Sequence, residues 1–275
     1  MKRVTNLSPA PRILTEVLGL LKDINTSPQI LAKAISKDQS LVVKILTISN
    51  SPFYGLSKRV SSIEYAIMIL GFNEIRNIVT ALSLMESLKN KSDQYLNQKE
   101  FWIHAYITAT ISKKIADDMG LRQSGDAFIG GLLHDLGISV IHRYLHSDFV
   151  SICESVKTGM KYPEAENIAL GMDHQEVGNM LLKNWNFPDQ FCDIVKYHHT
   201  PHNANNTKVI GSIIHFADFM TQRLKLGSFD WDNDIELNND VASSLQFKDM
   251  ESVDKFIELY RHPVEQQIES LRYLS

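Results

Sequence analysis

Apolar residues recur at helical spacing along almost the whole chain, and this feature constrains the fold most strongly. Between residues 13 and 21, for example, Ile13, Val17 and Leu21 fall on one stripe. Residues that interrupt helices are scarce, since the 275 residues include only 13 Gly and 8 Pro. The pattern therefore predicts an all-α protein.

Several helix ends can be placed from local signals. Ser27 followed by Pro28 is typical of a helix start, and Gly71 is typical of a helix end. The run at 41–48 is almost continuously apolar and could form either a strand or a helix. We predict a helix because no alternating partner strand lies nearby. We also expect Asn73 to cap a helix that begins at Glu74.

Changes in composition divide the chain into three parts. Residues 89–99 are polar and lack apolar periodicity, which places a boundary near residue 95. We therefore expect one helical lobe over 1–95 and another over 96–225. The remainder, 226–275, begins with an acidic stretch that we interpret as a loosely ordered surface segment. It ends in a helix that we expect to be interrupted near Pro263.

The balance of charge excludes some classes of partner. The chain has 28 basic and 32 acidic side chains, a net charge of −4, so no global attraction to nucleic acid or an anionic membrane is expected. Cys153 and Cys192 are too few for a disulfide framework. No apolar run reaches the roughly twenty residues that a membrane helix needs. These features predict a soluble, cytoplasmic protein.

Polar side chains on apolar helix faces are the main indication of function. His104 shares its face with Ile107 and Ile111, and Asp218 lies inside the apolar run at 213–220. A buried carboxylate costs several kcal/mol unless a cation or strong donors meet it. For each residue alone, a core histidine bonded to a carbonyl oxygen or a helix-capping aspartate is the favoured interpretation.

Taken together, these residues point to a metal site. Five histidines and two aspartates have this character: His104, His134, Asp135, His174, His198, His199 and Asp218. Imidazole combined with carboxylate suits zinc, iron or manganese, and Asp135 can bridge two ions. Two divalent ions bring four positive charges and two aspartates return two negative ones. The remaining charge would attract a small phosphate-containing ligand.

Several motifs resemble those of one family. The run GGLLHDLG at 130–137 resembles the signature of the HD superfamily, and more narrowly the chain resembles the HDOD family. Five further motifs support this resemblance in the expected order: NSPFYG at 50–55, AIMILG at 66–71, HQEVG at 174–178, WNFP at 185–188 and YHHTP at 197–201. The resemblance covers about residues 7–223.

The resemblance implies an N-terminal helical bundle and an HD-like helical bundle. HDOD proteins are bacterial signalling modules that are similar in fold to HD phosphohydrolases and have no established catalysis. In the metal-dependent HD and HD-GYP relatives, the positions that match His104, His134, Asp135 and Asp218 hold one ion. A second ion would use Asp135 as a bridge, together with His174, His198 and His199.

Two departures from the enzymes favour a regulatory role. Ile138 stands where HD enzymes often carry a lysine that contacts phosphate, and after His199 the chain lacks the acidic residue and Gly-Tyr-Pro of the HD-GYP enzymes. We therefore expect a cytoplasmic regulatory module that acts through protein partners, with a pocket for one or two divalent ions. The alternative is a metal-dependent phosphohydrolase acting on a nucleotide or cyclic dinucleotide. No catalytic residue is assigned.

Overall fold

The computed structural model of the chain describes residues 26–50, 56–88, 90–224 and 235–272, together with residues 16, 19, 54 and 231. These residues form helices joined by turns and loops, and no strand occurs among them. The predicted all-α fold is confirmed. Two compact units are present: a large unit, Asn90–Tyr260, and a small unit formed by the described residues before and after it. The domain boundaries expected from composition remain a prediction.

The small unit is built from short helices around an aliphatic core. Its helices before residue 90 are α2 (Pro28–Ile35), α3 (Gln39–Ser49), α4 (Ile63–Leu70) and α5 (Phe72–Ser87). The Ser27 hydroxyl caps α2 by accepting the Ile30 N–H, and Ser62 caps α4 in the same way. The region at 41–48 is helical, as predicted. Helix α5 begins at Phe72, so the expected cap Asn73 lies inside the helix.

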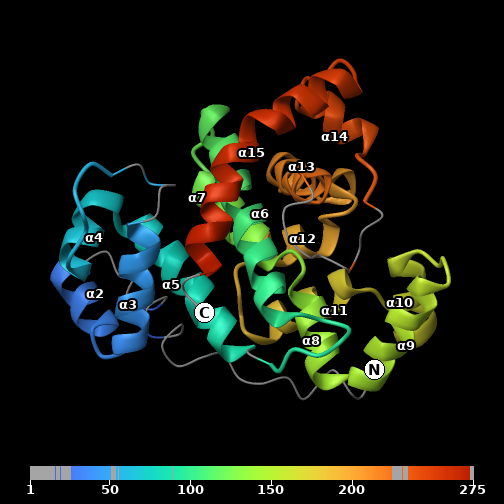
Figure 1. Cartoon of the computed structure of the whole chain (residues 1–275), viewed down its shortest axis with the longest axis horizontal. Helices are drawn as coiled ribbons and strands as arrows, with labels where there is room; N and C mark the ends of the chain where they lie inside the picture. Colours follow the sequence, from blue (N-terminus) through green and yellow to red (C-terminus); the bar gives the residue numbers. More distant parts are fainter. Residues whose placement is uncertain are drawn as a thin grey trace. The chain divides into compact units, whose positions relative to one another are not determined.

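The large unit contains most of the helices (Figure 1). In chain order they are α6 (Gln98–Asp118), α7 (Ser124–Leu133), α8 (Leu136–Tyr144), α9 (His146–Lys157), α10 (Tyr162–Leu170), α11 (His174–Asn184), α12 (Asp189–Tyr197), the single turn η2 (Pro201–Asn203), α13 (Lys208–Leu224) and α14 (Asn239–Ser244). Helix α15 (Met250–Arg272) begins in this unit and continues beyond it. Among these described helices, none is both long and apolar enough to span a membrane.

Helix α6 is central to the large unit and packs against α7 and α13. It is buried along nearly its whole length, including Phe101 and Tyr106. Helix α11 packs against α8 and α12. Since burial of a large aromatic or aliphatic side chain contributes about 1.5–3 kcal/mol, this core fixes the helices that carry the predicted site.

Two glycines allow the helices around the predicted HD motif to approach closely. A Cβ atom on Gly131 of α7 would lie 2.8 Å from the Cα of Ala109 in α6. A Cβ atom on Gly137 of α8 would collide with the carbonyl of His174 in α11. His134 and Asp135 lie between these two glycines, at the corner where α7 ends and α8 begins. The small residues therefore bring α6, α11 and the HD corner together.

One prediction for the C-terminal part is wrong. Helix α15 continues through Pro263, whose neighbourhood is exposed, so water can satisfy the carbonyl that the proline leaves without an N–H donor. The acidic stretch lies partly outside the described residues, and most of its described residues are exposed or half-buried, although Trp231 and Val241 of α14 are buried. Apart from Glu16 and Gly19, the helix expected over 13–21 lies outside the described residues, and so does most of the turn at 50–55.

Candidate metal centre

Four of the predicted ligands converge from two helices, α6 and α13, and from the HD corner. His104 Nε2 lies 3.3 Å from His134 Nε2 and 3.2 Å from Asp218 Oδ1. Asp135 Oδ2 lies 3.3 Å from His134 Nε2 and 3.6 Å from His104 Nε2. His134 Nε2 and Asp218 Oδ1 are 3.7 Å apart. We call these four side chains the first donor set.

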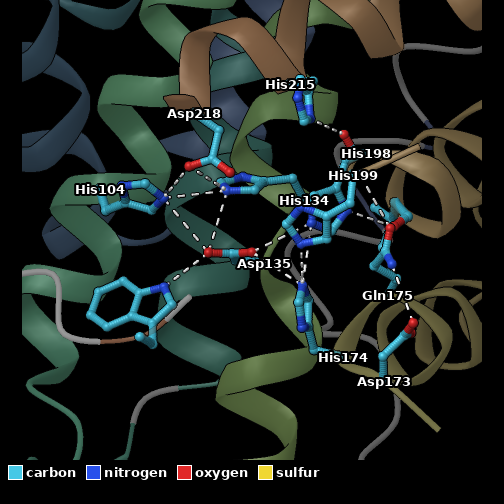
Figure 2. A network of polar contacts seen from close by, with 12 residues as sticks. His104, His134, Asp135, Asp173, His174, Gln175, His198, His199, His215 and Asp218 are labelled. Atoms are coloured by element: carbon cyan, nitrogen blue, oxygen red, sulfur yellow. Dashed lines mark hydrogen bonds and ion pairs between the residues drawn. The ribbon is translucent and has the colours of Figure 1, made fainter. Parts of the chain in front are cut away.

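The other predicted ligands form a second donor set on the opposite side of Asp135 (Figure 2). His174 Nε2 lies 3.3 Å from His198 Nε2 and 3.1 Å from His199 Nε2. Asp135 Oδ1 lies 3.7 Å from His174 Nε2 and 3.6 Å from His198 Nε2. The structure therefore brings all seven predicted residues into one cluster.

The spacing of the donor atoms matches the size of a bound divalent ion. Metal–ligand bonds of about 2.0–2.2 Å place tetrahedral donors roughly 3.3–3.6 Å apart. Within the first donor set the distances above run from 3.2 to 3.7 Å. Asp135 directs one carboxylate oxygen to each set, which is the arrangement of a carboxylate that bridges two ions.

Hydrogen bonds on the outer edges of the rings orient the inner nitrogens. His134 Nδ1 lies 2.7 Å from the Gly131 carbonyl oxygen, and His198 Nδ1 lies 2.8 Å from the Val195 carbonyl oxygen. A carbonyl oxygen only accepts, so each Nδ1 must donate. In the neutral ring this leaves the Nε2 lone pair directed at the donor set, as metal-ligating histidines require.

The same orientation holds for two more rings. His174 Nδ1 donates to Glu166 Oε2 at 2.8 Å. His104 Nδ1 lies 3.2 Å from the Thr221 hydroxyl, which itself donates to the Asp218 carbonyl oxygen at 2.7 Å. Because that hydroxyl proton is already used, the Thr221 oxygen accepts from His104. Four of the five imidazoles are thus held with Nε2 inward.

Two buried oxygen atoms support a fit to metal ions. Asp135 Oδ1 and Asp218 Oδ1 are inaccessible to solvent and accept no hydrogen bond from the described residues. A buried carboxylate oxygen without a donor costs free energy, and a bound cation would remove that cost. The donor chemistry, imidazole with carboxylate, suits zinc, iron or manganese. These residues therefore fit the predicted ions.

The electrostatics of the first donor set favour positive charge. Burial opposes an imidazolium, but the adjacent carboxylates of Asp135 and Asp218 outweigh it and raise the pKa of His134 well above its usual range. Burial likewise opposes both carboxylates, yet His134 above all holds the pKa of Asp135 and that of Asp218 below the usual range. The pocket thus stabilises a cation between two anionic groups.

In the second donor set, burial and the neighbouring histidines favour a neutral imidazole. Burial, followed by the neighbouring His199 and His134, lowers the pKa of His198 well below its usual range. His198 is therefore neutral near pH 7, and neutral imidazole is the form that ligates metal. His174 and His198 are fully buried, whereas His199 is only partly buried. The centre is thus most accessible beside His199.

Sequence reasoning missed the residues that orient the ligands. Glu166 and Thr221 hold two of the rings, as described above. His215 Nδ1 donates to the His198 carbonyl oxygen at 2.9 Å, and Gln175 Oε1 accepts the His199 N–H at 3.2 Å (Figure 2). His215 lies three residues before Asp218 on the same helix face, which is the one signal that could have identified it.

A third group of potential ligands has a different hydrogen-bond pattern. His142 Nε2 lies 2.9 Å from Asp93 Oδ2, and His146 is close to the same carboxylate. The Asn90 side-chain amide lies 3.0 Å from His142 Nδ1, and its oxygen already accepts the Lys91 N–H. The amide therefore donates to Nδ1, so the proton sits on Nε2 and bonds to Asp93. This arrangement describes a structural histidine rather than a ligand.

Comparison with known proteins identifies the family. The family model of the HDOD domain matches residues 7–201. This match spans most of the chain, and the chain belongs to the HDOD family, as the sequence motifs indicated. Asp218, His215 and Trp231 lie beyond the matched residues.

Individual relatives agree with this assignment. An uncharacterized protein of Treponema pallidum (strain Nichols) is 25% identical over 220 residues, which are 78% of this chain and 42% of that protein. The uncharacterized protein YuxH of Bacillus subtilis (strain 168) is 27% identical over 182 residues, 66% of this chain and 39% of that protein. The chain thus spans about two fifths of the length of both relatives.

A solved structure supports the fold. The crystal structure of an HDOD domain protein with unknown function from Geobacter sulfurreducens superposes with a TM-score of 0.82 at 24% identity, covering 98% of each chain. At this level of identity the likeness concerns the fold alone. The helical architecture described above is therefore the HDOD architecture.

Proposed function

We propose that this chain is a cytoplasmic regulatory module of HDOD type that binds two divalent metal ions and acts through contacts with protein partners. The observation that carries the metal part is the pair of donor sets that share Asp135. Each set places three or four ligand atoms at coordination spacing. The orientation of the rings by outer hydrogen bonds gives further support.

Named residues would hold each ion. His104, His134 and Asp218 with Asp135 Oδ2 would hold the first, and the second would be held by the histidines of the second donor set with Asp135 Oδ1. When bound, such ions supply positive charge that attracts and polarises a phosphate-like anion. The chain's own contribution is to fix the donors before the ion arrives. The two carboxylates raise the pKa of His134 and so favour a proton on this ring, and a bound cation would replace that proton as their counter-charge.

Two features favour regulation over hydrolysis. Ile138 occupies the position where HD enzymes often carry a phosphate-contacting lysine, and it is fully buried, so this position offers neither charge nor donor to a substrate. On α4 of the small unit, the adjacent Met68 and Ile69 are both exposed, and partner proteins commonly bury such apolar side chains. The family's signalling role agrees with both features.

Metal analysis tests the proposal. The wild-type chain, loaded anaerobically with Zn²⁺, Mn²⁺ or Fe²⁺ and then desalted, should retain about two ions by elemental analysis. Asp135→Ala should retain less than about one tenth of that amount with an unchanged circular dichroism spectrum, because it removes the shared ligand. Retention of less than about one tenth of an ion by the wild type contradicts the metal part.

The enzyme alternative is tested on the same samples. A metal-dependent phosphohydrolase would turn over a nucleotide or a cyclic dinucleotide, and Asp135→Ala would abolish the activity. The regulatory proposal predicts no turnover by the loaded wild type across a panel of both substrate classes. Turnover that depends on Asp135 would replace the regulatory proposal with the enzymatic one.

A further inference from the structure

The indole of Trp231 contacts the carboxylate that joins the two donor sets. Trp231 Nε1 donates a hydrogen bond to Asp135 Oδ2 at 2.9 Å. The indole ring also meets His104 edge to face, with ring centroids 5.7 Å apart, and packs against Phe101 at 5.4 Å. Only 4% of the Trp231 surface is exposed. The side chain is therefore a packed part of the centre and not a surface residue.

The contact is compatible with metal binding at the same oxygen. A carboxylate oxygen has two lone pairs, so Asp135 Oδ2 can accept the indole N–H with one and ligate an ion with the other. Outer hydrogen bonds of this kind fix the orientation of a ligating carboxylate. Indole is a donor only, so it can hold Asp135 without itself competing for the ion.

The described contacts of Trp231 with the centre involve the first donor set and not the second. Trp231 touches Asp135 Oδ2 and His104, which both belong to the first donor set. The second donor set instead contains His199, the one ligand that is only partly buried. The two donor sets thus differ in their described surroundings. The Trp231 indole shields the first set, whereas the second set is accessible beside the imidazole of His199.

We infer that Trp231 is a positioning residue of the metal centre, which orients Asp135 toward the first ion and shields that ion from solvent. This inference rests on the proposed function. The first ion then exchanges slowly and the second exchanges quickly. In a regulatory module, the quickly exchanging ion beside His199 is the one that can respond to the metal supply or to an incoming anion.

Release of zinc to a chelator tests the inference. The protein is loaded with two equivalents of Zn²⁺, desalted and mixed with excess 4-(2-pyridylazo)resorcinol, whose absorbance reports each released ion. The wild type should release zinc in two phases of equal amplitude. Trp231→Phe keeps an aromatic ring but loses the N–H donor, and it should accelerate the slow phase at least tenfold while leaving the fast phase within twofold. Trp185→Phe, a second buried tryptophan that packs against Phe187, should change neither phase.

A second measurement tests the inference in case Trp231→Phe folds poorly. In ¹H–¹⁵N spectra of the wild type, the Trp231 indole signal, assigned through its contacts with Phe101 and His104, should shift when zinc is added, and the Trp185 signal should not. The inference is overturned if the slow phase changes less than twofold in Trp231→Phe, if release is a single phase in the wild type, or if the Trp231 indole signal ignores zinc. A wild type that takes up no zinc overturns the proposed function and this inference together, whereas two retained ions with unaltered release overturn only the inference.

Discussion

Glu166 holds the outer edge of His174 through a single carboxylate oxygen. Glu166 Oε2 accepts the His174 Nδ1–H at 2.8 Å and the His174 backbone N–H at 3.0 Å, and both side chains are fully buried. A buried carboxylate bonded to a ligating histidine is the usual means of fixing the ring of a metal ligand. The second donor set is therefore oriented from α10, a helix that contributes no ligand of its own.

Replacing Glu166 tests this orientation. Glu166→Ala should weaken binding of the second ion by about 10–100-fold, the usual effect of losing such a partner. Glu166→Gln keeps an acceptor oxygen and should lose less than tenfold. Isothermal titration with Zn²⁺ gives both values, and Glu164→Ala on the exposed face of the same helix is the matched control. Equal affinities in Glu166→Ala and the control would show that the contact does not orient a ligand.

Substitutions of Asp218 test whether this carboxylate is a metal ligand or only a costly buried polar group. Asp218→Asn should lower affinity for the first ion by at least tenfold, and Asp218→Leu should abolish binding there, because Oδ1 is a donor of the first set. Asp254→Asn, at an exposed ion pair with Arg223, should change nothing. If Asp218→Leu instead raises the melting temperature without altering metal content, Asp218 is only a structural group.

His142 provides a contrasting case within the same unit. It is buried and bonds to both the Asn90 amide and Asp93, so His142→Leu should remove two hydrogen bonds. We expect a loss of about 1–3 kcal/mol in the free energy of unfolding, because each of the two lost hydrogen bonds contributes about 0.5–1.5 kcal/mol. Metal content should not change. A loss of metal in His142→Leu by elemental analysis would mean that the third group also binds an ion.

Removal of metal should destabilise the large unit. A ligand that binds only the folded state at a hundred times its Kd contributes about 2.7 kcal/mol. For a unit of this size, that free energy corresponds to about 5–10 °C in melting temperature. Scanning calorimetry with and without chelator measures the difference, and Asp135→Ala should show no effect of the chelator. An identical melting temperature for the loaded and chelated wild type would contradict the prediction.

The class of fold and the side chains that cluster in the candidate site could be predicted from the sequence for simple reasons. Helical periodicity is a local property, so α3 could be assigned although its residues also suit a strand. His104 and Asp218 could be selected because a polar residue on an apolar helix face is costly. The motif around His134 and Asp135 linked these scattered residues to one another.

The orienting residues could not be predicted because their role depends on tertiary packing. Glu166 does not stand out in the sequence as a polar residue on a clearly apolar helix face. Its partner His174 is eight residues away along the chain. Trp231 lies in a stretch whose acidic composition suggested an exposed segment, yet its indole reaches a carboxylate 96 residues earlier. Pro263 illustrates the opposite error. A proline usually interrupts a helix, but α15 continues through Pro263 because the backbone there is exposed to water.

Anomalous diffraction at the metal edge tests the central claim most directly. Crystals of the loaded wild type should show two anomalous difference peaks that flank Asp135, one within about 2.0–2.2 Å of Oδ2 and the other at the same distance from Oδ1. The first peak should also contact His104, and the second should contact His198. Absence of any peak beside Asp135 in fully loaded crystals, or peaks only at other residues, would contradict a metal centre bridged by this carboxylate.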